Sequence, residues 1–334
     1  MGNELTISLV VYNGEKYIPS LFDSLKKQNL ENYELVVLDN ASADKTMEKV
    51  AEFCPHDIAV QMMKKEKNIG FAGGHNEVFK NLHTEYFLIL NQDIFLAPDV
   101  LEKLVNFLDT HLDVAAVAPR LNKWDFANHQ LTDNIDTLGL QVLKNRRVIE
   151  KKDLTATKSR NNGFIEVFGL SGACAMYRKS AIDKVGGLFD EDYFTYKEDV
   201  DLSYRLRQAG FRSFVLLGTT GWHDRTGSEK GKSDFAQAQN KIKQSQLVKY
   251  YSYRNHLMNL YKNEYWQNFI IDFPLILWYE LKKFVWFLCF DRQVLKALTN
   301  IWEMRKKLKV KRHEIKKMRV LNWRQFRALL KSIN

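Results

Sequence analysis

The chain has 334 residues, of which 45% are apolar and 27% are charged. These proportions are ordinary for a globular protein, so they exclude wholesale disorder, and the length allows one large α/β domain with an appendage. The three cysteines, Cys54, Cys174 and Cys289, form no CxxC pair, which argues against a disulfide framework or a structural zinc site and favours a reducing compartment. The N-terminus has no cationic segment followed by an apolar one, so we expect no secretory signal.

The net charge of +10 belongs to the C-terminal part of the chain. Residues 262–334 hold 17 Lys and Arg against 6 Asp and Glu, whereas the other 261 residues hold 33 against 34. A basic charge confined to one end of a chain is typical of a separable surface-binding segment.

The first 120 residues predict strands that alternate with helices. The predicted strands are residues 5–11, 33–38, 58–63, 86–90 and 114–118, and the predicted helices are residues 16–27, 44–53, 74–82 and one opened by Pro98. Continuous apolar strands separated by helices predict an α/β fold with a parallel sheet covered on both faces. Ligands of such sheets bind beyond the carboxyl ends of the strands, where Asp39 and Asp93 fall.

The second half of the chain is less regular. Residues 123–160 predict an inserted loop or hairpin near the site, and strands follow at 164–168, 172–177 and 211–217, with a helix at 198–209 that Gly210 stops. We therefore predict a catalytic domain at 1–225, a mobile loop and connecting helix at 226–261, and a basic, aromatic-rich helical tail at 262–334.

Asp39 is the first candidate ligand-binding residue, because it ends a strand and is followed by Asn40, Ala and Ser. A carboxylate in this place can accept hydrogen bonds from a nucleobase or a ribose. A simple turn with a helix cap at Asp44 explains the same residues equally well.

A glycine-rich turn that enters a helix is the second candidate. Exposed N–H groups at the start of a helix suit a phosphate or a nucleotide ribose. The segment matches neither GxGxxG nor a P-loop, and a close strand-to-helix turn is the structural alternative. Its donor-binding candidates are Asn68, Gly70, Gly74 and Asn76.

Asn91-Gln92-Asp93 follows a buried apolar strand and is a candidate metal site. Such a position can present a carboxylate to Mg²⁺ or Mn²⁺, which prefer oxygen ligands and retain waters and substrate phosphates. The cation would neutralise a departing nucleoside diphosphate. His223, which we place just past the last strand, is either a second metal ligand or a core histidine.

Glu198 and Asp199 form the start of a predicted helix, where the helix dipole favours ionised carboxylates. A carboxylate held there can take a proton from an attacking hydroxyl, although helix capping is the simpler explanation. Asp201 points elsewhere around the helix, so the three acids cannot all face one ligand.

These segments resemble, in order and spacing, the inverting glycosyltransferases of family 2, especially the rhamnosyltransferase-like branch that builds bacterial surface polysaccharides such as O-antigen. The resemblance spans roughly residues 4–225. It implies a GT-A fold, in which a nucleotide-binding sheet is followed by an acceptor-binding half. The matching segments are VVYNGEKYI, LVVLDNASAD, NIGFAGGHN, ILNQD, GLSGACAMYRKSAIDKVGGLFDEDYFTYKEDVDLSYRL and the segment around His223.

The resemblance also implies residue roles. Asp39 matches the nucleobase-binding aspartate, Asp93 the metal carboxylate of the DxD motif, Asp199 the general base, and His223 a histidine that can join the metal. Asn91 departs from the DxD motif, which removes one charged ligand and puts the metal affinity in doubt.

The implied reaction is a single displacement on a nucleoside-diphosphate sugar, with dTDP-rhamnose as the first expectation and UDP-sugars as the second. Gly172 and Ala173 would shape the acceptor side, and Glu198 would orient the base or an acceptor hydroxyl. The expected acceptor is a saccharide, either free or linked to a lipid.

The tail combines aromatic and basic segments. No stretch approaches the 18–20 uncharged residues that a spanning helix needs, but the apolar runs at 273–279 and 284–290 fit helices lying at a membrane surface. Residues 305–319, nine of them basic, suit anionic lipids. We expect a cytoplasmic protein at the inner face of the membrane. The alternative is that these helices pack on the catalytic domain or form a homo-oligomer.

Two other classes of protein remain open. A nucleotidyltransferase shares the strand–helix start and the metal carboxylate, but it needs neither the Glu-Asp helix start nor the aromatic tail. A nucleic-acid-binding protein explains the basic tail but leaves Asp39, Asp93 and Asp199 without a role, so we expect no nucleic-acid partner.

Overall fold

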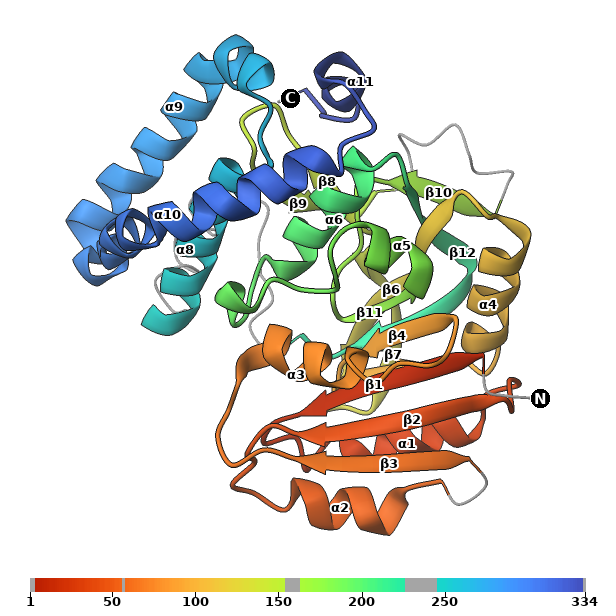
Figure 1. The fold of residues 1–334 in the computed structure, drawn as a ribbon. Coiled ribbons are helices and arrows are strands. Elements are labelled where there is room, and N and C mark those ends of the chain that lie inside the picture. Colours follow the sequence, from red (N-terminus) through yellow and green to blue (C-terminus); the bar gives the residue numbers. More distant parts are fainter. Residues whose placement is uncertain (1–3, 56–57, 154–162, 226–244, 333–334) are drawn as a thin grey trace.

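A computed structural model describes residues 4–55, 58–153, 163–225 and 245–332, and a single ten-stranded sheet forms its centre (Figure 1). Eight strands follow the order β10-β12-β6-β11-β4-β1-β2-β3, while β5 pairs with β12 and β7 with β6. The strands of this sheet are β1 (Leu5–Val11), β2 (Tyr33–Asp39), β3 (Ala59–Lys64), β4 (Tyr86–Leu90), β5 (Ile94–Leu96), β6 (Val114–Asp125), β7 (Gln130–Thr137), β10 (Phe164–Val167), β11 (Cys174–Arg178) and β12 (Arg212–His223).

The sheet is mixed but mostly parallel, and the five strands predicted in the first 120 residues all run in the same direction, as the sequence predicted. Strands β1, β2, β3 and β4 are parallel to one another, and β12 is parallel to β6. Strand β11 runs antiparallel to both β4 and β6, between which it lies. All five residues of β11 are buried. An apolar run of this kind reports burial on both faces and carries no information on strand direction.

Helices cover both faces of the sheet, as the sequence predicted. Successive side chains of a strand point to opposite faces, so Leu5, Ile7 and Leu9 of β1 join one core cluster, while Val36 and Leu38 of β2 join the other. The first cluster packs under α1 (Ile18–Lys26), α2 (Thr46–Phe53) and α4 (Val100–Thr110), and the second under α3 (Gly70–Phe79), α5 (Lys179–Lys184) and α6 (Glu198–Gln208).

Two element boundaries differ from the prediction near the strand ends. Helix α3 begins at Gly70 and not at Gly74, so the glycine-rich segment is the first turn of the helix itself. Strand β12 extends to His223, which is therefore the last residue of the strand and not a residue beyond it. Residues 123–150 form the predicted hairpin region, since β6 continues into a pairing with β7, and β8 (Leu140–Val142) pairs with β9 (Val148–Glu150).

The C-terminal helices pack on the catalytic part of the chain. They are α8 (Gln246–Asn263), α9 (Trp266–Phe290), α10 (Lys296–Lys317) and α11 (Trp323–Ala328), with a short 3₁₀ turn at Arg292–Leu295 (η2) between α9 and α10. Another 3₁₀ turn, Glu191–Tyr193 (η1), precedes α6. Figure 1 shows α8 beside the loop before α6, and α9 at the outside. The predicted loop at 226–261 falls partly outside the described residues, which resume before α8.

The two short apolar helices predicted in the tail are one continuous helix, α9. The charged residues that interrupt the apolar pattern do not end the helix, and Asp272, Glu280 and Lys283 among them form ion pairs. Glu280 accepts a 2.7 Å hydrogen bond from Nε2 of His256 on α8 and lies beside Lys283, one helical turn further on. Among the described residues, no helix combines the length and apolar character that crossing a membrane requires.

Candidate active site

Asp39 lies at the carboxyl end of β2, beside the end of β1. The register pairs Val11 of β1 with Asp39, and Leu9 of β1 with Leu90 at the end of β4. Asp39 is almost fully buried, and its Oδ1 accepts a 2.9 Å hydrogen bond from the backbone N–H of Ser42. The carboxyl ends of β2 and β4 therefore flank β1 at one edge of the sheet, as the sequence predicted.

Asn40 and Asn68 hold the glycine-rich segment in place. Nδ2 of Asn40 donates to Oδ1 of Asn68 and to the carbonyl of Gly70, both at 3.1 Å, and its Oδ1 accepts from the N–H of Ile69 at 2.8 Å. Oδ1 of Asn68 also accepts from the N–H of Gly70 at 2.8 Å. These amides already have partners within the protein, so their contacts with a nucleotide-sugar donor stay a prediction.

Gly70, Gly74 and Asn76 likewise have packing roles. Gly70 has φ +79°, and a Cβ there would lie too close to the carbonyl oxygen of Phe194. A Cβ on Gly74 would meet Val10 at 2.7 Å. Nδ2 of Asn76 donates to the carbonyl of Phe189 at 2.9 Å, and its Oδ1 accepts from the same residue's N–H. Each residue therefore shapes the edge of the site, and its direct contact with a nucleotide-sugar donor stays a prediction.

Asp93 and His223 meet at this edge although 130 residues separate them in sequence. Nε2 of His223 lies 3.4 Å from Oδ2 of Asp93, and its Nδ1 lies 3.0 Å from Oδ2 of Asp136. The backbone brings them together because His223 pairs with Ile94 across β12 and β5. Burial opposes the charged imidazole, but the hydrogen bond to Asp136 and the nearby Asp93 outweigh it and raise the pKa of His223 to about 9.

Asp136 was missed by the sequence analysis. It is fully buried on β7, and Arg225, which forms an ion pair with Glu150, also lies 3.5 Å from it. Burial raises the pKa of Asp136, but the hydrogen bond from His223 and the charge of Arg225 lower it below its usual value. Asp136 follows no predicted strand end and matches no motif, so no signal in the sequence marked it.

Gln92 was also assigned no role, and the structure shows that it holds the loop after β1. Its Oε1 accepts from the N–H of Tyr12 at 3.0 Å and its Nε2 donates to the carbonyl of Tyr12 at 3.1 Å. A paired amide of this kind fixes the position of the residues on either side of it, Asn91 and Asp93.

Asp199 is connected to the carboxyl end of β4 through hydrogen bonds that involve the backbone of residues 172 and 173. Its Oδ2 accepts from the N–H of Gly172 at 3.2 Å, and its Oδ1 accepts from the N–H of Val200 at 2.7 Å. The residue after Gly172, Ala173, accepts from the N–H of Asn91 at 2.9 Å. The antiparallel direction of β11 makes this possible, because it brings the start of β11 beside the end of β4.

Glu198 and Asp199 are neighbouring carboxyl groups in different surroundings. Burial and the adjacent Asp199 raise the pKa of Glu198 to about 8, and no described residue bonds its Oε2. Burial also raises the pKa of Asp199, while the charge of Lys197 and the two backbone N–H groups oppose the rise. Asp199 is therefore the one of the two that ionises more readily.

Asp201 faces away from this pair, as predicted. It is fully buried and contacts Arg205 on its own helix, while Lys262 of α8 lies 2.9 Å from it. These cations hold the pKa of Asp201 below its usual value despite burial.

Among the described residues, no group of three or more His, Cys, Asp or Glu side chains is arranged to bind a metal ion. Asp93 and Nε2 of His223 are two potential ligands that face each other, and the hydrogen bond at Nδ1 is the orientation that metal-binding histidines adopt. Mg²⁺ and Mn²⁺ sites commonly use one or two protein side chains together with substrate phosphates and water, so the residues fit.

Comparison with known proteins agrees with the sequence-based expectation. The protein-family model described as glycosyl transferase family 2 matches residues 6–186. An N-acetylglucosaminyl-diphospho-decaprenol L-rhamnosyltransferase of Mycobacterium tuberculosis is 24% identical over 68% of this chain and 78% of its own length. The O-antigen chain rhamnosyltransferase RfbN of Salmonella typhimurium is 25% identical over 63% of this chain and 62% of its own length.

Other relatives are matched over a smaller part of their length. An uncharacterized glycosyltransferase of Haemophilus influenzae is 33% identical, but over only 32% of this chain and 44% of its own length. The chain thus spans less than half of that relative.

The solved structures show the fold. A mannosyltransferase of Pyrobaculum calidifontis, in complex with GDP-Man and Mn²⁺, has a TM-score of 0.54 at 14% identity and covers 95% of this chain and 86% of its own. Residues 1–349 of Staphylococcus aureus TarS, in complex with UDP, have a TM-score of 0.53 at 15% identity and cover 98% and 90%. The predicted GT-A fold with a helical C-terminal part is confirmed. Its relatives in glycosyltransferase family 2 include rhamnosyltransferases. Because the family model matches more than half of its residues, the chain belongs to this family.

Proposed function

We propose that the protein transfers a sugar from a nucleoside-diphosphate donor to a hydroxyl group of a saccharide acceptor, with inversion at the anomeric carbon. The observation that supports this most is the chain of contacts from Asp199 through Gly172 and Ala173 to Asn91. It places a carboxylate that can act as a base beside the strand end that carries Asp93. A base and a diphosphate site at one edge are what a single displacement needs.

Asp93 and His223 would hold the divalent cation, Mg²⁺ or Mn²⁺. When bound, such a cation supplies positive charge against the diphosphate of the donor. Asp136 orients His223 through the bond to Nδ1, and Gln92 steadies the segment that carries Asp93.

Asp199 would accept the proton of the acceptor hydroxyl as its oxygen bonds to the anomeric carbon. The bond between that carbon and the diphosphate breaks at the same time, and its electron pair leaves with the diphosphate. Glu198, whose pKa of about 8 keeps it largely protonated at neutral pH, would donate a hydrogen bond that orients the acceptor or Asp199. Gly172 and Ala173 would line the acceptor side.

The donor that we favour is dTDP-rhamnose, because two relatives are named rhamnosyltransferases. UDP-sugars are the second choice, and TarS has been solved with UDP. The name of the mycobacterial relative, which refers to a diphospho-decaprenol acceptor, favours a lipid-linked saccharide acceptor here.

A panel of nucleotide sugars, tested with and without Mn²⁺ for protection against thermal unfolding, tests the donor. A ligand that binds only the folded state raises the melting temperature. We expect metal-dependent protection by one class of nucleotide sugar, and release of nucleoside diphosphate once an acceptor is added. Release of pyrophosphate instead would identify a nucleotidyltransferase, and protection by none would contradict the proposal.

Replacing Asp136 by asparagine should weaken the metal response without removing it. An asparagine keeps the shape but no longer favours the N–H on Nδ1 of His223 as strongly, and changes of this kind cost about 10–100-fold in metal affinity. The measurement is Mn²⁺ titration in the presence of UDP or dTDP. Asp133→Asn, on the same strand at an exposed position, is the control. Equal metal affinity in both variants would remove Asp136 from the site.

We propose that the protein works at the inner face of the cell membrane, with α9 against the lipid. Many large apolar side chains of this helix are exposed, and a groove of about 400 Å³ between α8, α9 and α10 is lined mostly by apolar residues. The most exposed of them are Trp266, Ile270, Trp278 and Phe290 on α9, together with Trp302 on α10. Interfacial helices bind through such faces.

The basic run of the tail should contribute less to membrane binding than its net charge predicted. Lys307 and Lys311 form ion pairs with Asp190 and Asp192 of the catalytic part, and Arg312 donates to the carbonyl of Tyr261. These positive charges are engaged in contacts within the protein. Truncation at residue 262 would remove Lys307 and Lys311 from the two aspartates, so point variants of the exposed face are a sharper test of membrane binding.

The double variant Trp278→Glu and Trp302→Glu should bind phosphatidylglycerol vesicles at least about tenfold more weakly, because two exposed indoles are replaced by repelled charges. High salt should weaken binding of the unmodified protein without abolishing it, since buried aromatic rings are not screened. Vesicle cosedimentation measures both effects. Leu112→Glu, at an exposed apolar residue between α4 and β6, is the control. Equal binding by all three proteins would refute the membrane proposal.

A further inference from the structure

The loop that delivers Glu198 and Asp199 has an unusual backbone. Phe194, Tyr196 and Lys197, the residues directly before the pair, all have positive φ, at 62°, 68° and 70°. Residues other than glycine adopt this conformation at a cost in free energy, so neighbouring groups must hold it. The position of the carboxyl pair therefore depends on whatever holds this loop.

Helix α8 supplies the groups that hold it. Asn255 is fully buried, and its Nδ2 lies within hydrogen-bond distance of three carbonyl oxygens of the loop. Its acceptors are the carbonyl oxygens of Tyr193 at 2.9 Å, Thr195 at 2.8 Å and Tyr196 at 2.6 Å. One amide has only two N–H bonds, so the three carbonyls share them.

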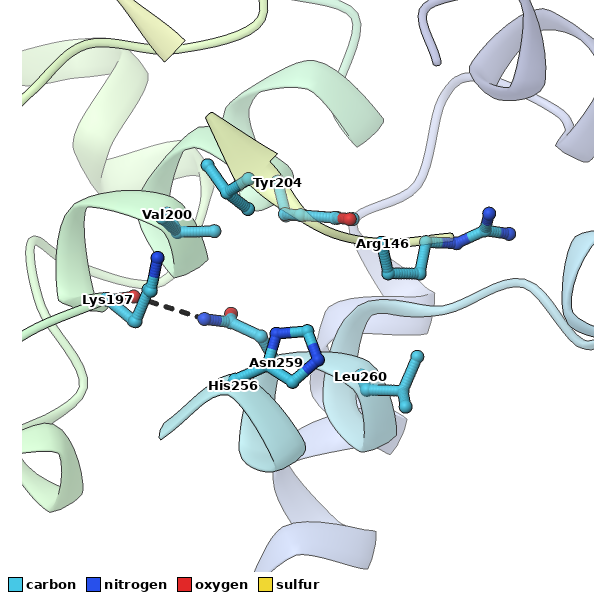
Figure 2. Close-up of a pocket in the computed structure, with 8 residues that line it drawn as sticks. Arg146, Lys197, Val200, Tyr204, His256, Asn259 and Leu260 are labelled. Atoms are coloured by element: carbon cyan, nitrogen blue, oxygen red, sulfur yellow. Dashed lines mark hydrogen bonds between the residues drawn. The ribbon is translucent and has the colours of Figure 1, made fainter. Parts of the chain in front are cut away.

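Asn259 continues the contact one turn further along α8. Its Nδ2 donates to the carbonyl of Lys197 at 3.1 Å, directly before Glu198, as Figure 2 shows. Val200 and Tyr204 of α6 line the same small pocket as Asn259. The ring of Tyr251, also on α8, stacks on Phe194 at 5.2 Å.

The other side of the loop rests on the donor half of the site. The carbonyl of Phe194 accepts from the N–H of Ala72 in the first turn of α3 at 3.1 Å, and it is the atom that a Cβ on Gly70 would meet. The loop is thus held between α3 and α8. Movement of α8 would shift the carboxyl pair relative to the glycine-rich segment.

We propose that Asn255, supported by Asn259, is a positioning residue for the reaction, which acts by fixing the loop that carries Glu198 and Asp199. The helix that bears it lies beyond residues 6–186, the part of the chain that the family model matches. The C-terminal helices are thereby part of the catalytic apparatus as well as of the membrane face. This inference rests on the proposed roles of Glu198 and Asp199.

Asn255→Ala in the full chain tests the proposal, with Asn268→Ala as the matched control. Asn268 is an equally buried amide in the C-terminal helices, where it donates to the carbonyl of Trp323, away from the loop. We expect Asn255→Ala to lower kcat about 10–100-fold with the nucleotide sugar identified above, and to change the KM for that donor no more than about twofold. Asn268→Ala should change neither.

Hydrogen–deuterium exchange gives a readout that needs no substrate. In Asn255→Ala, the amides of residues 193–201 and of Ala72 should exchange about tenfold faster, while the sheet exchanges as before. If Asn255→Ala does not fold, Asn259→Ala should show a smaller change of the same kind, because it removes one bond to the loop, at Lys197, and one from Asn263 within α8.

The proposal is overturned if the Asn255 and Asn259 variants retain the kcat and loop exchange of the control. It is equally overturned if donor binding falls in step with kcat, since the residues would then support the structure as a whole. Asp199→Asn separates this result from failure of the proposed function. Normal turnover in Asp199→Asn would reject the base, whereas the exchange of residues 193–201 would still decide whether Asn255 holds the loop.

Discussion

Replacing Asp199 by asparagine should lower turnover by about 10²–10⁴-fold, the contribution of a general base. Asparagine keeps the size of the side chain and one oxygen acceptor for the N–H of Gly172 or Val200, but it cannot take a proton. Loss of one of these hydrogen bonds should cost about 1 kcal/mol of stability, so the variant should fold. The measurement is kcat with the identified donor, together with UDP or dTDP binding in the presence of Mn²⁺, which should be unchanged.

Asp183→Asn is the control for this variant, because Asp183 forms only a half-exposed ion pair with Lys179 on α5. Its turnover should match that of the unmodified protein. If Asp199→Asn also keeps near-normal turnover, Asp199 has no part in proton transfer, and Glu198, the other buried carboxyl group, becomes the candidate base.

Replacing Asp93 by alanine should abolish the metal-dependent part of nucleoside-diphosphate binding, a loss of at least about a hundredfold in affinity. Binding of the nucleoside alone should change much less, because the carboxylate is proposed to act on the diphosphate through the cation. The backbone contact in which the carbonyl of Asp93 accepts from the N–H of Asp224 survives in alanine, so the local fold should remain. Calorimetric titration of UDP or dTDP, with and without Mn²⁺, measures both terms.

Asp39→Ala is the complementary variant. Asp39 lies across β1 from the end of β4, and its proposed contact is with the base of the nucleotide. Its loss should weaken nucleoside binding while a response to Mn²⁺ remains. If both variants bind diphosphate and metal like the unmodified protein, the donor does not occupy the edge formed by β2 and β4.

Local patterns in the sequence were enough to predict the layered fold and the strand ends. Leu5, Ile7 and Leu9 alternate along β1 with residues that are polar or face the other side of the sheet. This alternation reflects burial of β1 on both faces, which can be inferred from residues that are neighbours in the sequence. Asp39 and Asp93 could be placed near each other because the parallel strands of an α/β sheet have their carboxyl ends on the same side of the sheet, where its ligands bind. The same patterns, taken together, predicted the family.

Other features depend on contacts between segments that are distant in sequence. The direction of β11 decides that Gly172 and Ala173 lie beside Asn91, yet an apolar run reads the same in either direction. Asp136 meets His223 only because β7 continues the hairpin from β6 at the side of β12.

The tail shows the limit of composition most clearly. Its sequence predicted apolar helices at 273–279 and 284–290 and a basic run after them, because helix propensity and charge are local. Only the tertiary structure decided that Lys307 and Lys311 pair with Asp190 and Asp192, and that Asn255 holds the loop before Glu198. A hydrogen bond or an ion pair needs two groups at one place, and the folded chain alone brings residues 59 to 121 positions apart to the same place.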